Sequence, residues 1–420
     1  MLIVLMFAVF TVSIGYGVVL PLLPYLIERL MPGSGNALIS RHTGMLTSIY
    51  TLALFMFAPI WGRVSDRYGR RAILLVGMLG FGASALAFSF VENLPAVYAG
   101  RALSGMFAAA VTPVASATIG DLAATDESRA RRLTLVGVAG IGGFLLGPML
   151  GVFIARLGEG LFAMNSSAGS LAIPLAASAV LALVVAVAIG FTVPGALHAS
   201  LRRQRTPAVD GSARLVLKLL ILAFIVSAGV GVFEVGLALR GKQELGLTPY
   251  QIALMFTECS LVMIVVQALV FSPLVHPTTT RWMIAPALAV LAVALFLVPR
   301  ASYYAMMLAV TGAVAASAGI LSPILTYWIS SKAGNAQGAE LGKQTAAASL
   351  GGAVGSAAGG LLFDFAYIPG APFLLMTALT TLGVGLSLGL PRLLAPQKVE
   401  AAHKRDAKVV PAQTRPAAGS

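Results

Sequence analysis

Two glutamates within long apolar runs are the residues of this sequence best suited to proton chemistry. Glu234 and Glu258 each interrupt such a run, and Asp364 lies near the end of another. A carboxyl group withdrawn from water can take up and release protons near neutral pH when a cavity opens to one side or the other. Counting from the predicted outer helix ends, Glu258 lies about eight residues or ~12 Å deep and Glu234 about four residues or ~6 Å. We therefore expect Glu258 to carry a proton, with Glu234 as second choice and Asp364 close to the surface.

Arg101 is the basic residue placed to act with these acids, because it lies in the apolar run from Tyr98 to Gly105. A charge in the middle of a membrane span costs at least about 2.5 kcal/mol on insertion scales, so it should face a cavity or a partner. There it would tune or relay the proton. The alternative is a side chain that reaches back to the outer interface, since Arg101 is only about six residues, roughly 9 Å, from the predicted helix start.

Residue types that serve enzymes are not gathered anywhere in the sequence. The four histidines lie in predicted loops or in the tail, and Cys259 is the single cysteine. This pattern offers no metal site and no Ser-His-Asp type of nucleophile. Residues 338–344 contain glycines and a lysine, but their spacing is wrong for a phosphate loop. We expect no enzyme activity, no metal and no cofactor, with a proton gradient as the energy source.

The composition shows which class of protein must position these residues. Of the 420 residues, 58% are hydrophobic and 10% are charged, whereas about a quarter of an average soluble chain is charged. Dividing the chain at about 20 apolar residues per span predicts an all-α polytopic membrane protein with twelve transmembrane helices. The predicted helices are 2–27, 43–61, 72–91, 95–120, 133–156, 171–193, 215–238, 250–272, 282–298, 303–330, 343–365 and 372–390.

The positions of the basic residues indicate topology. A net charge of +13 could suggest a nucleic-acid partner, but most of the 28 Lys and Arg fall in alternate loops and in the tail, on one side of the predicted bilayer. Loops rich in Lys and Arg stay in the cytoplasm. We therefore expect a multi-pass protein of the plasma (inner) membrane with cytoplasmic N- and C-termini and with no nucleic-acid partner.

The longest polar interruption divides the predicted helices into two sets of six. Residues 194–214 form a predicted cytoplasmic linker between a bundle at 1–193 and a bundle at 215–390. The basic tail, 391–420, is rich in Ala, Lys, Arg and Pro and is expected to be disordered. Two parallel halves with nested inverted repeats are a transporter architecture whose substrate site lies near the middle of the bilayer.

The loop after the second predicted helix carries the most specific pattern. Residues 62–71 read Gly-Arg-Val-Ser-Asp-Arg-Tyr-Gly-Arg-Arg. Gly62 and Gly69 permit tight turns at either end, while Asp66 and Arg70 are placed to pair locally or to cap helix ends. The string closely resembles the cytoplasmic signature of the major facilitator superfamily, Gly-x-x-x-Asp-Arg-x-Gly-Arg-Arg/Lys.

This resemblance implies the major facilitator fold, two pseudo-symmetric six-helix bundles, over residues 1–390. It also implies that the loop is a gate latch. The residues that would share this role are Gly62, Asp66, Arg67, Gly69, Arg70 and Arg71, with Asp121 paired to one of the arginines. The run around Arg101 resembles the superfamily's helix 4 motif, Arg-x-x-Gln-Gly, with Ser104 in place of glutamine. In transporters of this type that arginine is linked to proton coupling.

The fifth predicted helix contains a glycine motif made by Gly143, Gly147, Pro148 and Gly151. Glycines four residues apart form a smooth stripe for close helix packing, and the proline bends the helix. The pattern Gly-x-x-x-Gly-Pro-x-x-Gly resembles the antiporter motif of drug:proton antiporters, although Thr134 and Val152 stand where that motif has glycine. Helix packing alone is the alternative explanation. A second stripe, at glycines 351, 355 and 359, is consistent with an internal repeat.

Aromatic residues are the candidates for the walls of a cavity between the halves. They are Tyr16, Tyr50, Phe107, Phe144, Phe233, Phe256, Tyr327 and Trp328. Aromatic walls with one arginine and one or two acids suit amphipathic molecules, including cationic ones.

The sequence therefore predicts a secondary active transporter that exports a small amphipathic molecule or drug in exchange for protons, by alternating access. Its expected partners are the small-molecule substrate, protons and the lipid bilayer, and it is expected to work as a monomer. Two alternatives stay open: a proton-coupled symporter that imports a metabolite, and a dedicated exporter of a metabolite such as a siderophore. The glycine motif of the fifth helix favours export over import.

Overall fold

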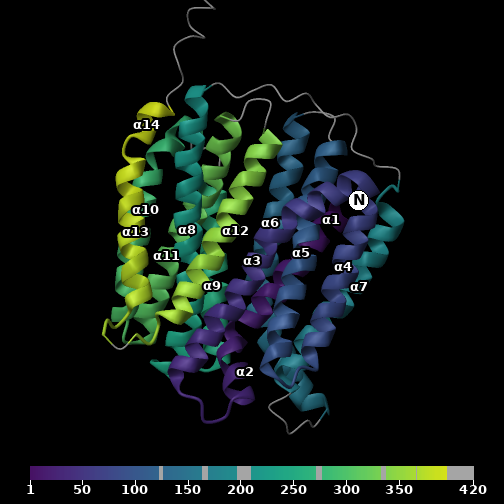
Figure 1. The fold of residues 1–420 in the computed structure, drawn as a ribbon, viewed down its shortest axis with the longest axis vertical. Coiled ribbons are helices and arrows are strands. Elements are labelled where there is room, and N and C mark those ends of the chain that lie inside the picture. The colour runs from purple at the N-terminus through teal and green to yellow at the C-terminus, as the bar shows by residue number, and fades with distance from the viewer. Residues whose placement is uncertain are drawn as a thin grey trace, which may run out of the picture.

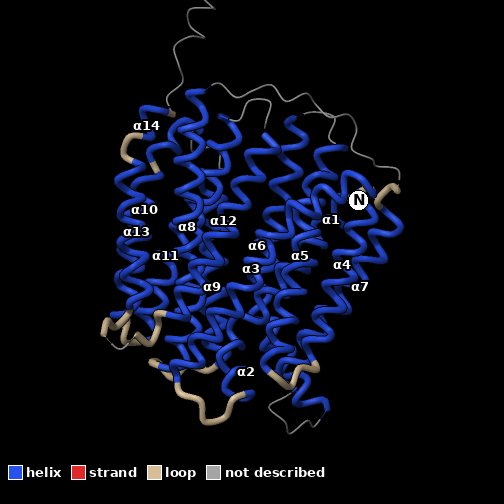
Figure 2. The backbone as a smooth tube through the Cα atoms, viewed as in Figure 1, coloured by secondary structure: helices blue, strands red, loops and turns tan. Residues whose placement is uncertain are grey.

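The computed structural model describes residues 1–122, 126–162, 169–195, 210–270, 277–332, 337–365 and 367–394. Within these ranges the chain is almost entirely helical, without a β-strand, and its long helices run roughly side by side (Figures 1 and 2). The first half contains α1 (Leu2–Val19), α2 (Leu23–Leu30), α3 (Asn36–Tyr68), α4 (Arg70–Ser89), α5 (Leu94–Leu122), α6 (Asp126–Phe162) and α7 (Gly169–Thr192). The second half contains α8 (Asp210–Gln243), α9 (Pro249–Val270), α10 (Ile284–Leu297), α11 (Tyr304–Lys332), α12 (Gln337–Leu361), α13 (Ala371–Ser387) and the short α14 (Leu390–Leu393). The 3-10 segments are Leu20–Leu22, Pro277–Trp282 and Val298–Arg300.

Each of the twelve predicted spans corresponds to helical structure. Nine helices in the described part of the chain are long and apolar enough to cross a membrane. Leu135–Gly151, within α6, and α13 are shorter apolar helices, and α12 is a 25-residue helix rich in Gly and Ala. The protein is therefore an all-α membrane protein, as hydropathy predicts.

The first predicted helix is interrupted. A single helix over residues 2–27 was the expectation, but the structure has α1, the 3-10 segment Leu20–Leu22 and then α2. Pro21 and Pro24 lie in this region. Proline has no N–H to donate to the preceding turn, so two prolines three residues apart break the α-helical hydrogen bonding.

Several helices continue into polar sequence beyond their apolar runs. Gly62 lies inside α3, so the predicted turn at Gly62 is wrong, and the chain turns only at Gly69, whose φ is 92°. The Ser65 hydroxyl donates to the carbonyl oxygen of Gly62 at 2.8 Å, within the helix. Likewise α8 begins at Asp210, inside the predicted linker 194–214, and α14 lies partly in the predicted tail. Residues 196–209 and 395–420 are outside the described residues.

The two glycine stripes pack equivalent helices together in the two halves. The stripe of α6 contacts α1: Gly143 lies against the carbonyl oxygen of Phe10, and Gly147 against that of Ile14. The stripe of α12 contacts α8 in the same way. There Gly351 lies against the carbonyl oxygen of Phe224, Gly355 against that of Ala228, and Gly359 against Val232. In both pairs, glycine and contact advance together by four residues, as pseudo-symmetric halves require.

The two ends of the molecule differ in how the halves meet. We call one end the α2 end, since α2 lies there, and the other the Gly69 end, after the turn between α3 and α4; α2 is at the bottom of Figure 1. At the α2 end, Lys242 of α8 forms an ion pair with Glu28 of α2 at 2.6 Å and donates to the carbonyl oxygen of Pro24 at 2.9 Å. The Tyr25 hydroxyl donates to the carbonyl oxygen of Leu247 at 2.5 Å. These contacts close the α2 end.

Candidate functional site

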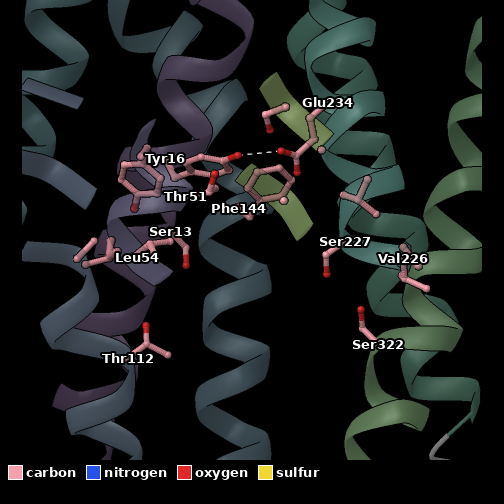
Figure 3. Close-up of a pocket in the computed structure, with 18 of the residues that line it drawn as sticks. Ser13, Tyr16, Thr51, Leu54, Thr112, Phe144, Val226, Ser227, Glu234 and Ser322 are labelled. Carbon is pink, nitrogen blue, oxygen red and sulfur yellow. Dashed lines mark hydrogen bonds between the residues drawn. The ribbon is translucent and has the colours of Figure 1, made fainter. Parts of the chain in front are cut away.

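A cavity of about 340 Å³ lies between the two halves, with lining residues from both (Figure 3). The helices α1, α3, α5 and α6 line it from the first half, and α8, α9, α11 and α12 from the second. A second cavity of about 230 Å³ adjoins it. The residues shared by both are Tyr16, Phe144, Val230, Glu234, Met263 and Ala318. Combined, the two have the size of a small-molecule site.

A hydrogen bond joins the halves inside this cavity. The Tyr16 hydroxyl, on α1, donates to Glu234 Oε2, on α8, at 2.8 Å (Figure 3). Glu234 is the charged side chain among the described residues that line the cavity. A carboxylate at an interface between two moving bodies can exchange its protein donor for a proton or for a cationic group of a ligand. The bond therefore couples the occupancy of Glu234 to the contact between the halves.

Arg101 extends this network behind Tyr16. The Arg101 guanidinium carbon lies 4.6 Å from the centre of the Tyr50 ring and 5.6 Å from that of Tyr16. The two tyrosine rings stack with centroids 4.9 Å apart. Arg101 Nε donates to the carbonyl oxygen of Leu46 at 3.3 Å, and the residue is only 2% exposed. Its side chain therefore packs inward, away from the interface position that was the alternative, and the ring faces stabilise its charge.

The depth expected for Glu234 is wrong, whereas that expected for Glu258 agrees with its helix. Glu234 lies nine residues before the end of α8 at Gln243, and Glu258 lies nine residues after the start of α9 at Pro249. At 1.5 Å per residue both lie about 13 Å from their helix ends. The helix α8 continues past the end of its apolar run. Arg240 and Lys242, in its last turn, form ion pairs with Glu244 and with Glu28 of α2. Depth therefore gives no reason to rank Glu258 first.

The two glutamates differ in the helix face on which they lie, because Glu234 faces the cavities and Glu258 does not. Glu258 is half-buried and lines neither described cavity. Its Oε1 points toward Gly312 of α11, where an added β-carbon would lie 3.3 Å from this oxygen. Its Oε2 is buried without a hydrogen-bond partner. Asp364 is exposed. The structure therefore brings Glu234 and Arg101 to the same tyrosine, Tyr16, and places Glu258 within the second half. No group of three or more His, Cys, Asp or Glu that could hold a metal occurs in the part of the chain that the structure describes.

The aromatic residues expected in the cavity divide into two sets. Tyr16 and Phe144 line both cavities, and Phe233 and Phe256 line the second. Phe107 instead lies beside Trp61, with ring centroids 6.4 Å apart, and lines neither described cavity. Tyr327 is 38% exposed, packs against Trp328 and also lines neither. A helical face cannot be assigned from residue type alone, since aromatic side chains serve equally in the core and against lipid.

Sequence reasoning missed the hydroxyl groups of the larger cavity. Its lining includes Ser13, Thr51, Thr112, Ser227, Ser322 and Ser356. A signal was present in the sequence: residues 12–17 and 226–231 both read Val-Ser-x-Gly-x-Gly, and Thr112 and Ser322 each precede a proline. These repeats place the hydroxyls at equivalent positions in the two halves.

The turn at Gly69 is surrounded by an ion-pair network within the first half. Arg70 is 6% exposed; its Nη1 contacts Asp66 Oδ1 and Ser65 Oγ, both at 2.6 Å. Its Nε donates to Asp121 Oδ2 at 2.9 Å, so Arg70 is the arginine that pairs with Asp121. Arg67 lies over the ring of Tyr68, and Arg71 lies near Gly195. The network ties α3, α4 and α5 together.

The cavity opens toward this end. Thr112 on α5 and Ser322 on α11 line it on the Gly69 side of Tyr16 and Glu234, and both are exposed although they lie within long helices. The α2 end is closed by the contacts of Lys242 and Tyr25, and there Gly44 of α3 packs directly on Gly360 of α12. A central site open to one end and closed to the other is the geometry of an alternating-access carrier.

Comparison with known proteins agrees with this geometry. Residues 5–339 match the sequence profile of the Major Facilitator Superfamily. The chain belongs to this superfamily. Its members are transporters, so this superfamily member is a membrane transporter and not an enzyme.

Among curated proteins, this transporter is 29% identical over 396 residues to "Multidrug resistance protein 2" of Bacillus subtilis (strain 168), which covers 92% of this chain and 94% of the relative. It is 24% identical over 362 residues to "Quinolone resistance protein NorA" of Staphylococcus aureus, covering 86% and 89% of the two chains.

Solved structures show the same fold at lower identity. A D-xylose-proton symporter matches with a TM-score of 0.73 at 16% identity, over 93% of this chain and 97% of that one. The human organic anion transporter MFSD10 (TETRAN) matches with a TM-score of 0.69 at 20% identity, over 92% and 98%. The fold is thus shared by carriers named for different substrates.

Proposed function

We propose that this transporter exports small amphipathic molecules, drugs among them, from the cytoplasm in exchange for protons. The multidrug and quinolone resistance proteins similar to it over most of their length support this assignment. The observation that carries it is the Tyr16–Glu234 hydrogen bond, which places an acid in the central cavity, at the contact between the two halves.

In the proposed cycle, Glu234 binds a proton and the substrate alternately. The Gly69 end faces the cytoplasm, since most basic residues lie on that side, so the present conformation is the one that takes substrate from the cytoplasm. A cationic substrate group displaces the Tyr16 hydroxyl from the Glu234 carboxylate, and the halves close at the Gly69 end. When the α2 end opens, a proton from outside binds Glu234 and releases the substrate. Differential binding of this kind drives the conformational exchange.

Other parts of the site have supporting roles. Arg101 holds Tyr50 and Tyr16 in place and offsets negative charge near Glu234. Glu258, outside the cavity, is a second proton-binding residue that responds to the packing of α9 on α11. The network of Arg70, Asp66 and Asp121 is the latch that changes partners when the Gly69 end closes. The transporter works as a monomer, because its two halves supply the walls of the central cavity. It lies in the plasma membrane with cytoplasmic termini, in keeping with the distribution of its basic residues.

The decisive experiment is proton movement in inside-out vesicles that hold an acidic lumen. Substrates to add are tetraphenylphosphonium, a fluoroquinolone and an organic acid. We expect the cationic or zwitterionic compounds to release protons from the lumen in the wild type. The Glu234→Gln variant should lose at least about 90% of this signal, because it keeps the shape of the side chain but cannot cycle a proton.

Two controls give this result its meaning. Glu92→Gln changes an exposed glutamate outside the cavity and should behave as the wild type. Glu258→Gln should reduce the proton signal less than Glu234→Gln does; the opposite order would return the principal role to Glu258. Full proton release in the Glu234→Gln variant would overturn the assignment of Glu234, and alkalinisation of the medium by external substrate would indicate import.

A further inference from the structure

Four hydroxyl groups face the larger cavity from equivalent positions in the two halves. Ser13 and Ser227 occupy the same place in the Val-Ser-x-Gly-x-Gly strings of α1 and α8. Thr112 and Ser322 occupy the position before a proline in α5 and α11. Figure 3 shows Ser13 and Thr112 on one side of the space between the halves and Ser227 and Ser322 on the other. The internal repeat thus places hydrogen-bonding groups on both sides of the cavity.

These four hydroxyls differ from others on the same helices. In an apolar setting, a helical Ser or Thr usually bonds the carbonyl oxygen four residues earlier. Thr11, Thr118 and Ser317 do so, with distances of 2.7, 2.7 and 2.8 Å. The four cavity hydroxyls make no such bond within the described part of the chain, and Ser356, also in the lining, is 1% exposed with an unpartnered Oγ. Their capacity to donate and accept is therefore available to a ligand.

The two cavities differ in chemistry on either side of Glu234. Apart from Tyr16, Glu234 and Cys259, the residues that line the second cavity are apolar or glycine, with Phe144, Phe233 and Phe256 among them. The larger cavity, on the Gly69 side, carries the hydroxyls. A ligand that fills both would place an aromatic portion in the second cavity, a cationic group at Glu234, and a neutral hydrogen-bonding portion among the hydroxyls.

We propose that Ser13, Thr112, Ser227 and Ser322 form a hydrogen-bonding subsite, so that the preferred substrates are monocations with an aromatic portion at one end and hydroxyl or sugar groups at the other. This rests on the proposed export function and names its substrate class. Purely lipophilic cations use only Glu234 and the aromatic cavity.

The test compares two cationic probes with one set of variants. Doxorubicin has a planar ring system, hydroxyl groups and an amino sugar, whereas tetraphenylphosphonium has no hydrogen-bonding group. The variants are the pairs Ser13→Ala with Ser227→Ala, and Thr112→Val with Ser322→Ala. The matched controls are Thr118→Val on α5 and Ser317→Ala on α11, whose hydroxyls bond their own helices. Binding to purified protein and gradient-driven uptake into inside-out vesicles are both measured.

We expect each paired variant to weaken doxorubicin binding by about fivefold or more, since each lost neutral hydrogen bond costs about a factor of two to ten. Tetraphenylphosphonium binding should stay within about twofold, and the controls should leave both probes unchanged. Equal effects on both probes, no effect on either, or a wild type that binds only tetraphenylphosphonium would overturn the subsite.

Failure of the export function gives a different result. Selective loss of doxorubicin binding in the variants, without gradient-driven uptake by the wild type, would support the subsite and overturn proton-coupled export. A wild type that neither binds nor moves either probe would overturn both proposals.

Discussion

At the scale of single residues, Tyr16 has a role that its neighbour Tyr50 does not share. Both rings stack with each other and lie over Arg101. Only Tyr16 donates a hydrogen bond to Glu234, across the two halves. The ring stack holds the hydroxyl in position, and the hydroxyl connects the halves. Replacing either tyrosine by phenylalanine removes one oxygen atom and keeps the ring. Comparing the two variants therefore distinguishes the contribution of the bridging hydrogen bond from that of ring stacking.

Tyr16→Phe should slow proton-driven export by at least about tenfold while the protein still folds. A hydrogen bond to a charged group is worth about 1.5–3 kcal/mol, and this variant removes it without disturbing the stack. The measurement is the initial rate of substrate uptake into inside-out vesicles at a fixed pH gradient. Tyr50→Phe is the matched control, since no hydrogen bond from its hydroxyl occurs within the described residues; a similar loss in both variants would mean that the stack alone matters.

The partners of these residues could be predicted only in part. A charge within an apolar run indicated that Arg101 and Glu234 need an internal environment, and that expectation follows from the cost of burial. Hydropathy could not say that Tyr16 and Glu234 meet, because they lie on helices from different halves. The serines of the repeated strings were visible in the sequence, but hydroxyls cost little in a membrane helix and so give no hydropathy signal.

At the scale of elements, the helices themselves were predictable and their ends were not. Apolar runs located all twelve spans, because a segment in lipid must satisfy its backbone internally. The ends of α3 and α8 extend past the apolar runs, where polar side chains find partners such as Arg70 for Asp66 and Glu28 for Lys242. Those partners belong to other elements, so the sequence of one helix does not contain them. The error in the depth of Glu234 has this origin.

The glycine stripes yield a stability prediction for α12. Gly355→Ala should lower the melting temperature, because the added carbon would overlap the backbone of Ala228 on α8. Overpacking of this kind costs about 1–3 kcal/mol. Thermal unfolding in detergent measures the change. Gly342→Ala, on the same helix, meets nothing within 4 Å, so it should leave the melting temperature unchanged or slightly raised. Equal destabilisation by both substitutions would contradict the proposed close packing.

At the scale of the whole molecule, the arrangement of two similar halves explains why one conformation is closed at one end. The buried core of residues 215–394 is largely separate from that of the first half. The halves pack against each other along α3 with α12 and α6 with α9, and polar contacts between them include those at the α2 end and the Tyr16–Glu234 bond. Because the two cores are largely separate, we expect each half to move as a body, with these polar contacts contributing to the balance between states. The motif of residues 62–71 indicated such a carrier, but not which end is closed.

Lys242 holds the α2 end shut, and Lys242→Met should shift the balance toward opening there. The variant loses the ion pair with Glu28, a hydrogen bond to Pro24 and contact with the Tyr25 ring. With Glu28 largely exposed, the ion pair is worth at most about 1 kcal/mol, which corresponds to about fivefold in population. The single cysteine, Cys259, lines the second cavity and is 9% exposed, so it reports on access without further engineering.

The expected result is about fivefold faster labelling of Cys259 by a charged, membrane-impermeant thiol reagent applied from the α2 side. Lys343→Met, on α12, is the control: its partner Glu340 is a near neighbour on the same helix. If Lys242→Met leaves the labelling rate at the wild-type value, the contacts of Lys242 do not determine closure. The direct packing of Gly44 on Gly360 would then be the contact that closes the α2 end, because backbone-to-backbone packing can hold the halves together without any charged group.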